Sequence, residues 1–550
     1  MRNSPPTIFT TAPALCLALV FTLGIAIRLG PPVIWAGGVL LGICAFLALS
    51  ALCGKRWCLA LEFALLAGFL RMHVAELPLG SDYRNRLLHE RCSARIQLVI
   101  RETPLLEGSL AELDSGRGLV TADIVTIQTI ADETPKPAKG TLVLTTTDWE
   151  QRQRLRVLKP GDNLQATGIL TSVRKNEPLE ATYCQHLRSR RVFHQFELMD
   201  FESLDSGVPR GMRQWPLKLR QCRIRLAKRL VRNFHSPQNA QLTLALGLGM
   251  SEFIPQETRR RQAVSGTIHV FAISGMHIGM VTLMLSTLLR WCGLPPNWQR
   301  VLLGILAAGY VLLTGSSISS LRALWMVWLA LYATQRHRRT AWLNALGCAA
   351  GLALLANPWQ LLDLGFQYSH LTVMVLLLGA PIVKTHVALL AERNAWLPRE
   401  LRPRRRTRLL QWLVGGLDAS IIAWLGNLGL AMHLNPQLSW GAPLLNLPLG
   451  ILIALALAFC PLRLFLGVIL PRFDYWWAQT LEWTMRLTEA VAESGHQSAF
   501  AHTHPLLPVW AVACYYCVFF ATLIYLQRFA TGPASEARLP NRDPHLSGEL

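Results

Sequence analysis

Serine and histidine stand three positions apart in an apolar stretch that reads IHVFAISGMHIG. On a helix this spacing puts Ser274 and His277 on one face, and with Asp363 or Asp418 they have the residue types of an intramembrane hydrolase. No oxyanion hole can be argued beside them. A second interpretation is a packing notch, because Gly275 weakens a helix and lets another backbone approach. A third is a broken helix that lines a conduit, as in transporters.

A second polar interruption, LTGSSISSLRA, contains Ser316, Ser319 and Arg322. An arginine within a membrane helix needs an ionic partner or water. Arg322 is therefore expected either to contact an anion in a pore or to form a structural ion pair with Asp363 or Asp418. The residue types favour neither alternative over the other.

Two more interruptions follow further along the chain. The segment NPWQLLDLGFQYSH places Gln367 and Ser369 at the start of a long apolar run, after a helix that Pro358 ends. An extramembrane turn explains the first part of this segment but explains Gln367 less well. In WGAPLLNLP, the prolines on either side of Asn446, including Pro448, are expected to break a helix at membrane depth. Non-helical backbone there must be buried in protein or line a water-filled path.

Membrane helices are the elements that must position these residues. The chain has 550 residues, of which 51% are hydrophobic and only 16% charged, too few charges for a soluble protein of this size. The stretch 471–497 is predicted to be either an interfacial helix or a further span. The other apolar residues gather into blocks of roughly twenty, the length that spans a bilayer: 12–29, 32–53, 58–77, 265–290, 299–315, 319–335, 341–357, 368–390, 411–432, 440–460 and 506–527.

Basic loops set the expected topology. Lys55 and Arg56 lie between the second and third blocks, and further basic runs lie at 336–339 and 402–408. The positive-inside rule places all three loops in the cytoplasm. Residues 1–80 are predicted to be N-terminal membrane helices that are retained rather than cleaved as a signal peptide. The third helix then leads outwards, so the segment after it is expected on the periplasmic side of a bacterial inner membrane.

Residues 90–205 have a different character from the rest of the chain. Short alternating runs are rich in Thr, Val and Ile, and a KPGD turn at 159–162 precedes one of them. About five strands are expected, which an OB-like barrel accommodates and other small barrels accommodate nearly as well. The predicted fold is therefore a polytopic α-helical membrane protein with an inserted small OB-like β-barrel domain on the periplasmic side.

A basic amphipathic surface helix is predicted within residues 210–236. The chain has 54 Lys and Arg against 33 Asp and Glu, a net charge of +21, which invites a polyanionic partner. The helix is expected either to contact lipid headgroups or to form a phosphate-binding track at a pore mouth. The predicted DNA-binding residues are Lys218, Arg220, Arg223, Arg225, Lys228, Arg229 and Arg232, together with Arg188, Arg190 and Arg191 at the end of the β-domain.

Residues 238–530 complete the membrane part, and 531–550 form a polar tail that is predicted to be disordered. Cys92 and Cys184 bracket the β-domain, and on an oxidising side they would either form a disulfide or remain as two thiols. A CxxC spacing near the C-terminus falls inside an apolar helix, which indicates core packing rather than a metal site.

The four polar segments, in this order, resemble the ComEC family of competence proteins. AISGMH is the most specific element, and the LTG…S…RA and NAL…NP…L…FQ.S patterns follow at the family's spacing. The Asn446–Pro448 element is a looser match to the family's Asn/Pro helix, and the GD…G.L phrase at 161–170 is similar to the family's external domain. The resemblance spans about residues 12–527. QYSH replaces the expected QLSF, and NEPL replaces an Asn-Pro-Gly-Gly phrase.

Long members of that family end in a metallo-β-lactamase-like domain, which needs a His-x-His-x-Asp-His zinc cluster. The string His502-Thr503-His504 lacks the aspartate and the last histidine, so it is interpreted as a loop. We therefore expect a conduit without enzymatic activity, and neither a metal site nor a cofactor.

The resemblance implies transport of single-stranded DNA across the bacterial inner membrane during natural transformation. Because the sequence has no GxxxxGK[ST] phosphate loop, energy is expected from a cytoplasmic helicase-like ATPase. A DNA-receptor protein on the outer side and membrane lipids are the other expected partners, and the oligomeric state is left open. The alternatives are a transporter or scaffold for lipid or an envelope polymer, and the hydrolase. The predicted pore-lining residues are Ser274, Gly275, His277, Ser316, Ser319, Arg322, Gln367, Ser369, Asn446 and Pro448.

Overall fold

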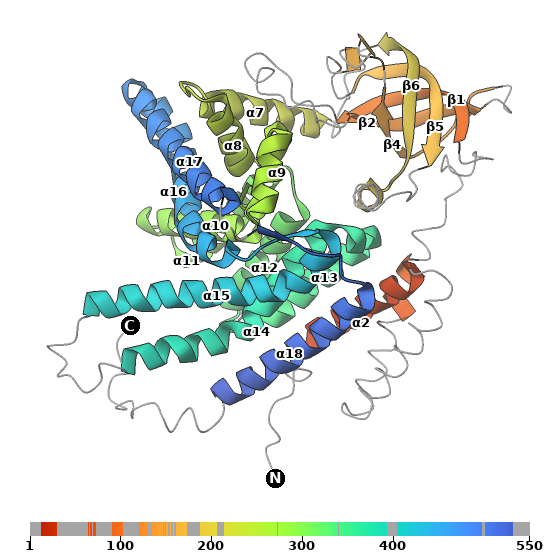
Figure 1. Ribbon diagram of the computed structural model, residues 1–550. Coiled ribbons are helices and arrows are strands. Elements are labelled where there is room, and N and C mark those ends of the chain that lie inside the picture. The colour runs from red at the N-terminus through yellow and green to blue at the C-terminus, as the bar shows by residue number, and fades with distance from the viewer. Residues whose placement is uncertain are drawn as a thin grey trace. The chain divides into compact units, whose positions relative to one another are not determined.

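The structure is a computed structural model (Figure 1). It describes residues 13–29, 91–102, 120–129, 187–205, 214–392 except 272 and 339, 404–497 and 501–531, with parts of 64–72 and 134–172. Two compact units are present and are treated separately below. The first comprises Met1–Gln256, Phe271–Gln367 and Ala454–Arg486, and the second comprises Glu257–Val270, Tyr368–Ile453 and Leu487–Leu550.

A strand-rich domain follows the N-terminal helix α2 (Pro13–Leu29). Its strands pair in the order β1-β5-β6-β4-β2-β3, and β1 also pairs with β2, so the pairings return to the first strand (Figure 1). All pairs are antiparallel except β4 with β6. The strands are β1 (Arg91–Glu102), β2 (Val120–Thr129), β3 (Lys136–Pro137), β4 (Thr141–Thr145), β5 (Asn163–Ser172) and β6 (Val192–Asp205).

Alternating apolar residues form the core of this domain, as the sequence pattern predicts. In β1 the side chains of Ala94, Ile96 and Leu98 are buried at every second position. Gly168 in β5 lies so close to β6 that a Cβ there would be 2.1 Å from the Glu197 carbonyl oxygen. The register of the β5–β6 pair shifts at this glycine, which indicates that a side chain would disrupt the pairing.

The rest of the described chain is mostly helical. α7 (Gln214–Leu230) and α8 (Pro237–Leu248) follow the β-domain and are succeeded by α9 (Gln256–Val264). The later helices are α10 (Gly275–Trp291), α11 (Pro296–Leu313), α12 (Ile318–Gln335), α13 (Trp342–Ala356), α14 (Leu364–Glu392), α15 (Arg404–Leu434), α16 (Ala442–Ile469), α17 (Asp474–Gln497) and α18 (Val509–Thr531).

Four helices in the described part of the chain are long and apolar enough to cross a membrane: Leu364–Leu390, Thr407–Leu434, Ala442–Phe465 and Val509–Gln527. They coincide with the last four predicted apolar blocks. The predicted blocks at 299–315, 319–335 and 341–357 also form helices, of 18, 18 and 15 residues. The block predicted at 265–290 is not one helix, because a 3-10 helix, η5 (Ile268–Phe271), precedes α10.

Two sequence predictions need correction. The prolines around Asn446 do not break a helix, since α16 runs without interruption from Ala442 through Pro448. Pro443 is the second residue of α16, where the missing N–H would have no partner within the helix. Pro448 is the seventh residue, and the helix continues past it with one backbone hydrogen bond fewer. The His502 region, predicted as a loop, includes a short strand, β8 (Ala501–Thr503), that pairs with β7 (Gln437–Ser439).

Some predictions concern residues outside the described part of the chain. The apolar block at 32–53, the tail at 532–550 and Cys184 belong to this group. Cys92 is a free thiol on β1. Its pairing with Cys184 stays a prediction.

Candidate functional site

The first sequence motif forms the start of α10. Ser274 caps this helix: its side chain accepts a hydrogen bond from the backbone N–H of His277. In return, His277 Nδ1 accepts a hydrogen bond from the backbone N–H of Ser274 at 2.9 Å. Such a reciprocal cap satisfies two N–H groups that a helix start otherwise leaves unpaired. The predicted interruption of the helix at this motif is confirmed.

The same cap bears on the hydrolase alternative. His277 is fully buried, and its Nδ1 already accepts a backbone N–H. A serine nucleophile needs its hydroxyl to donate to a histidine nitrogen that acts as the base. The geometry of Ser274 and His277 is thus that of a helix cap rather than that of a nucleophile and its base.

The second motif contacts the first through Arg322. Its guanidinium lies so close to the start of α10 that a Cβ built on Gly275 would be 2.2 Å from Nη2. Arg322 is only 5% exposed, and Ser317 Oγ donates to the Ile273 carbonyl oxygen at 3.4 Å. The two motifs therefore form one packed site. We call it the helix-break junction and define it as residues 273–277 and 314–322.

The helices α7 and α8 pack against this junction. α8 ends at Gly249, whose φ of 68° favours glycine and where a Cβ would lie 2.3 Å from the Thr314 carbonyl oxygen. Arg223 of α7 donates to the Leu248 carbonyl oxygen from Nε at 3.2 Å and from Nη2 at 2.8 Å. A Cβ on Gly315 would lie 3.3 Å from the same guanidinium. Arg223 thus serves as a cap for the C-terminus of α8.

The junction concentrates positive charge. The N-terminal ends of α10 and α12 meet there, and each helix start carries a partial positive charge. Arg322 and Arg223 add two guanidinium groups. Ser316 lies in the turn before α12, with a φ of 51°, and Ser319 lies in the first turn of that helix. Helix N-termini, guanidinium groups and hydroxyls together favour an anion such as a phosphate.

The third motif connects the β-domain to the helices of the same unit. Asn357 Nδ2 donates to the Ser189 carbonyl oxygen at 2.7 Å, and Ser189 Oγ donates to Asp363 Oδ2 at 3.2 Å. Phe193, at the start of β6, packs edge-on against Trp359 with ring centroids 5.3 Å apart. These contacts bridge more than 160 residues of sequence and fix the end of the β-domain to the 3-10 helix η6 (Pro358–Leu362).

Replacing Asn357 by alanine is expected to loosen this joint. The substitution removes the bond to Ser189 and the cap that Asn357 Oδ1 provides to Trp359 N. A loss of about 1–2 kcal/mol in the free energy of unfolding follows from one partly buried hydrogen bond and one cap. Thermal unfolding of the detergent-purified protein measures it. Asn297→Ala, at an exposed asparagine, is the control, and equal melting temperatures for the two variants would contradict the assignment.

The other predicted pore residues have local partners or lie within helices. Gln367 Nε2 donates to the Leu361 carbonyl oxygen at 2.8 Å. In the second unit, Ser369 lies in the second turn of α14, and Asn446 Nδ2 donates to Ser420 Oγ at 3.0 Å. Pro448 lies within α16. The pore-lining role of these four residues stays a prediction.

The two aspartates considered as ion-pair partners of Arg322 make hydrogen bonds to other residues. Asp363 accepts from Ser189 and from the backbone N–H of Phe366, at the start of α14. In the second unit, Asp418 Oδ2 lies 2.6 Å from His386 Nδ1. This pair joins two candidate membrane spans, where an ionisable pair is costly and usually has a function.

Comparison with known proteins identifies the family. The family model described as "Competence protein" matches residues 246–529, just over half of the chain. The chain belongs to the competence protein family. It is 24% identical over 391 residues to "ComE operon protein 3" of Bacillus subtilis (strain 168), across 68% of this chain and 46% of that protein. It is 32% identical over 154 residues to "Uncharacterized protein YcaI" of Escherichia coli (strain K12), across 26% of this chain and 20% of that protein.

The match to these relatives is partial. The chain spans less than half the length of either relative. No solved structure matches the chain. The region matched by the competence family includes the helix-break junction, the third motif and Asn446, whereas the β-domain and α7 precede it. The resemblance noted in the sequence is confirmed at the level of the family.

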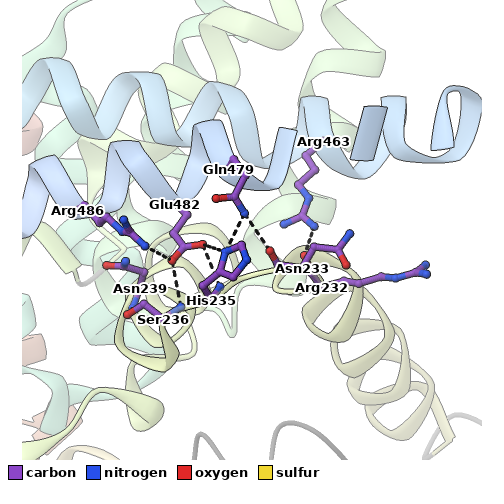
Figure 2. A network of polar contacts seen from close by, with 9 residues as sticks. All are labelled: Arg232, Asn233, His235, Ser236, Asn239, Arg463, Gln479, Glu482 and Arg486. Carbon is purple, nitrogen blue, oxygen red and sulfur yellow. Dashed lines mark hydrogen bonds and ion pairs between the residues drawn. The ribbon is translucent and has the colours of Figure 1, made fainter. Parts of the chain in front are cut away.

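A buried network that joins α17, inside the family region, to residues 235–236, just before it, was not found by sequence reasoning. Glu482 of α17, 1% exposed at its side chain, accepts hydrogen bonds from the backbone N–H groups of His235 and Ser236, both at 3.0 Å. It also accepts from Arg486 Nη2 at 3.1 Å. Figure 2 shows the carboxylate pointing at the start of α8, with Gln479 beside it. Burial raises the pKa of this carboxyl, but the hydrogen bonds outweigh burial and hold its pKa below the usual value.

Arg463 ties the same region to the end of α7. Its guanidinium donates to the carbonyl oxygens of Leu230 and Arg232, which end the helix, and its Nε lies 3.4 Å from Asp474 Oδ1. The ring of Phe234 lies 5.4 Å from the guanidinium carbon. Arg463 is 1% exposed, so it is a structural cation. In the sequence, a lone arginine beside an apolar block was the only indication that a buried partner for Arg463 exists.

The structure divides the predicted DNA-binding residues. Arg191 donates to the Ala356 carbonyl oxygen at 2.9 Å, and Arg223 caps α8, so both have structural partners. Lys218 is exposed on α7, and Arg188 and Arg190 stand in the turn before β6. Among the residues that the structure describes, no three His, Cys, Asp or Glu side chains are grouped to hold a metal ion.

Proposed function

We propose that this chain is the channel component through which single-stranded DNA crosses the bacterial inner membrane during natural transformation. Membership of the competence family implicates DNA uptake. The observation that supports the specific role of a DNA channel is that Arg322 is buried at a helix break inside the family region. DNA is a polyanion, and a buried guanidinium at such a break suits the passage of phosphates.

The chemistry of the helix-break junction supports this proposal. A phosphate that moves through a membrane must exchange water for other donors, and each contact must be weak enough to release it. The hydroxyls of Ser316, Ser317 and Ser319 and the first backbone N–H groups of two helices are groups of this kind. To contact a phosphate, Ser316 and Ser317 would exchange their present acceptors, the carbonyl oxygens of Val311 and Ile273. Gly275 leaves the space in which the Arg322 guanidinium lies.

The β-domain supports a second part of the proposal. Five of its strands pair in a closed order with one parallel pair, β4 with β6, which agrees with an OB-like barrel. OB folds hold single strands by a basic groove and by stacking of bases on aromatic rings. We propose that this domain lies on the periplasmic side and receives the strand, with Arg188, Arg190, Lys218 and Arg220 as candidate phosphate contacts.

Partners complete the proposed pathway. The sequence has no nucleoside-triphosphate phosphate loop, so a cytoplasmic helicase-like ATPase is proposed to pull the strand. A DNA-receptor protein is proposed on the outer side. The joint at Asn357 supports transmission of a load from the β-domain to the helices, because it fixes the two by hydrogen bonds and ring packing.

DNA binding by the full-length protein in nanodiscs of neutral lipid tests the proposal. A fluorescent single-stranded oligonucleotide is expected to bind with an affinity that falls steeply with salt, with a log–log slope of about −0.7 for each phosphate neutralised. Arg188→Gln with Arg190→Gln is expected to make that slope shallower by about 1.4.

Two exposed arginines elsewhere provide the control, Arg336→Gln with Arg338→Gln. Binding that does not depend on salt, or no binding at all, favours the alternative of a lipid or envelope-polymer transporter. An equal change of slope in the control would show that total charge, rather than the turn before β6, determines affinity.

A further inference from the structure

A cationic cavity lies where the end of α7 meets the turn between α16 and α17. Its volume is about 500 Å³. We propose that it binds the phosphate headgroup of an anionic phospholipid. This inference goes beyond the proposed transport of DNA and does not depend on it.

One face of α7 and the turn after it supply most of the charge. Arg225, Lys228, Arg229 and Arg232 all line the cavity, and their spacing of three, four and seven residues puts them on one side of a helix. Arg472, from the 3-10 helix η7 (Pro471–Phe473), adds a fifth cation from a distant part of the sequence. The dipole of α7 accounts for cations in its last turn only, so it does not explain the whole group.

The one carboxylate among the described residues that line the cavity is already engaged. Asp474 Oδ1 lies 3.4 Å from Nε of the buried Arg463, and Asp474 Oδ2 accepts from Asn233 Nδ2 at 3.1 Å. Asp474 therefore compensates a buried charge outside the group of five. The four arginines among them, Arg225, Arg229, Arg232 and Arg472, repel one another where they converge on the cavity unless an anion lies between them.

The surroundings of the cavity indicate a lipid rather than a free anion. The candidate span Ala442–Phe465 ends two residues before Gly467, which lines the cavity. The next residues expose a row of large apolar side chains: Phe465 is 65% exposed, Ile469 56%, Phe473 53% and Trp476 67%. Aromatic residues at the end of a span anchor a protein at headgroup level, and basic pockets at that level bind acidic headgroups.

The same features disfavour DNA as the occupant. A single strand needs aromatic faces beside a continuous cationic groove, whereas these aromatic and aliphatic side chains follow directly from a membrane span. Tyr475, which also lines the cavity, offers a hydroxyl that can donate to a phosphate oxygen. An acidic headgroup fits the charge, and its acyl chains fit the apolar row.

Native mass spectrometry of the full-length protein in a mild detergent tests the proposal. Cardiolipin, phosphatidylglycerol and phosphatidylcholine are added separately as probes. The wild type is expected to retain the two anionic lipids and not phosphatidylcholine. Arg229→Gln, Arg232→Gln and Arg472→Gln together are expected to lower the affinity for cardiolipin by on the order of a hundredfold, because each basic side chain near an anionic surface contributes several-fold.

A control variant removes three exposed arginines elsewhere: Arg290→Gln, Arg336→Gln and Arg338→Gln. It is expected to bind cardiolipin like the wild type. Arg472→Glu alone, in the exposed turn before α17, reverses one charge with little risk to folding and is expected to weaken cardiolipin binding. Wild-type cardiolipin binding by both cavity variants would overturn the proposal. So would a loss of affinity for a single-stranded oligonucleotide without any loss for cardiolipin, because the cavity would then be a nucleic-acid site.

Discussion

Arg322→Ala is expected to lower DNA import by roughly tenfold to a hundredfold, the range that corresponds to one lost hydrogen bond to a charged group. The guanidinium is 5% exposed and lies against the first residue of α10, where two helix N-termini meet. Without it the junction loses its central cation, and under the proposed function a phosphate that passes there loses its strongest donor. Uptake of labelled DNA into a nuclease-protected cytoplasmic pool measures the effect.

Arg336→Ala is the matched control, since Arg336 is an exposed arginine at the end of the same helix. A steric variant probes the contact without removing the charge. The Cβ of Gly275→Ala would meet Arg322 Nη2 and push it aside, whereas Gly279→Ala, four residues along the same helix, meets nothing within 4 Å. Import is expected to fall with the first glycine variant and to be unchanged with the second. Equal import by both glycine variants would show that import does not depend on the position of the Arg322 guanidinium.

Glu482→Gln is expected to destabilise the folded protein by about 3 kcal/mol, the cost of removing one partner from a buried charged network. The carboxylate oxygens accept hydrogen bonds from two backbone N–H groups at the start of α8. In glutamine one of these oxygens is replaced by an NH2 group, which cannot accept a hydrogen bond from a backbone N–H. The melting temperature of the detergent-purified protein should therefore fall by several degrees. Glu493→Gln on the same helix is the control, because Glu493 is partly exposed and lies 3.7 Å from Arg261.

The acid dependence of stability follows from the lowered pKa of Glu482. A carboxyl whose pKa is lower in the folded state stabilises the fold fully above its ordinary pKa, and this contribution is lost as the pH falls through the lowered value. The wild type should therefore lose stability on acidification in that window. The Glu482→Gln variant has no carboxyl to protonate at this position, so its stability should fall less than that of the wild type over the same pH range. Parallel acid profiles for the two proteins would contradict the assignment of the network.

Local sequence pattern predicted much of the fold. The apolar blocks predicted at 368–390 and 411–432 form membrane-length helices, and the alternation in β1 forms a half-buried strand, because both depend on neighbours in sequence. The break before Gly275 was predicted for the same reason. The expected break at Pro448 was wrong, because α16 continues past this seventh residue and bears the loss of one backbone hydrogen bond there.

Partners distant in sequence were beyond prediction. Arg463 meets the end of α7 across 233 residues, and Glu482 meets His235 across 247. An arginine beside an apolar block indicates that a partner exists, but only the packing of the helices selects which carbonyl oxygens it finds. Asp363 illustrates the same limit, since it was one of two alternative ion-pair partners for Arg322 and accepts a hydrogen bond from Ser189 at the β-domain joint.

We propose that this chain conducts single-stranded DNA. The most direct measurement is the uptake of labelled DNA into the cytoplasm of a naturally transformable host whose own gene of this family has been deleted and replaced by this one. Wild-type protein is expected to restore uptake, and Arg322→Ala, at equal membrane abundance, is expected not to. If uptake is absent although the wild-type protein is in the membrane, this chain does not conduct DNA. If the Arg322→Ala variant restores uptake as well as the wild type does, Arg322 does not contact the moving strand.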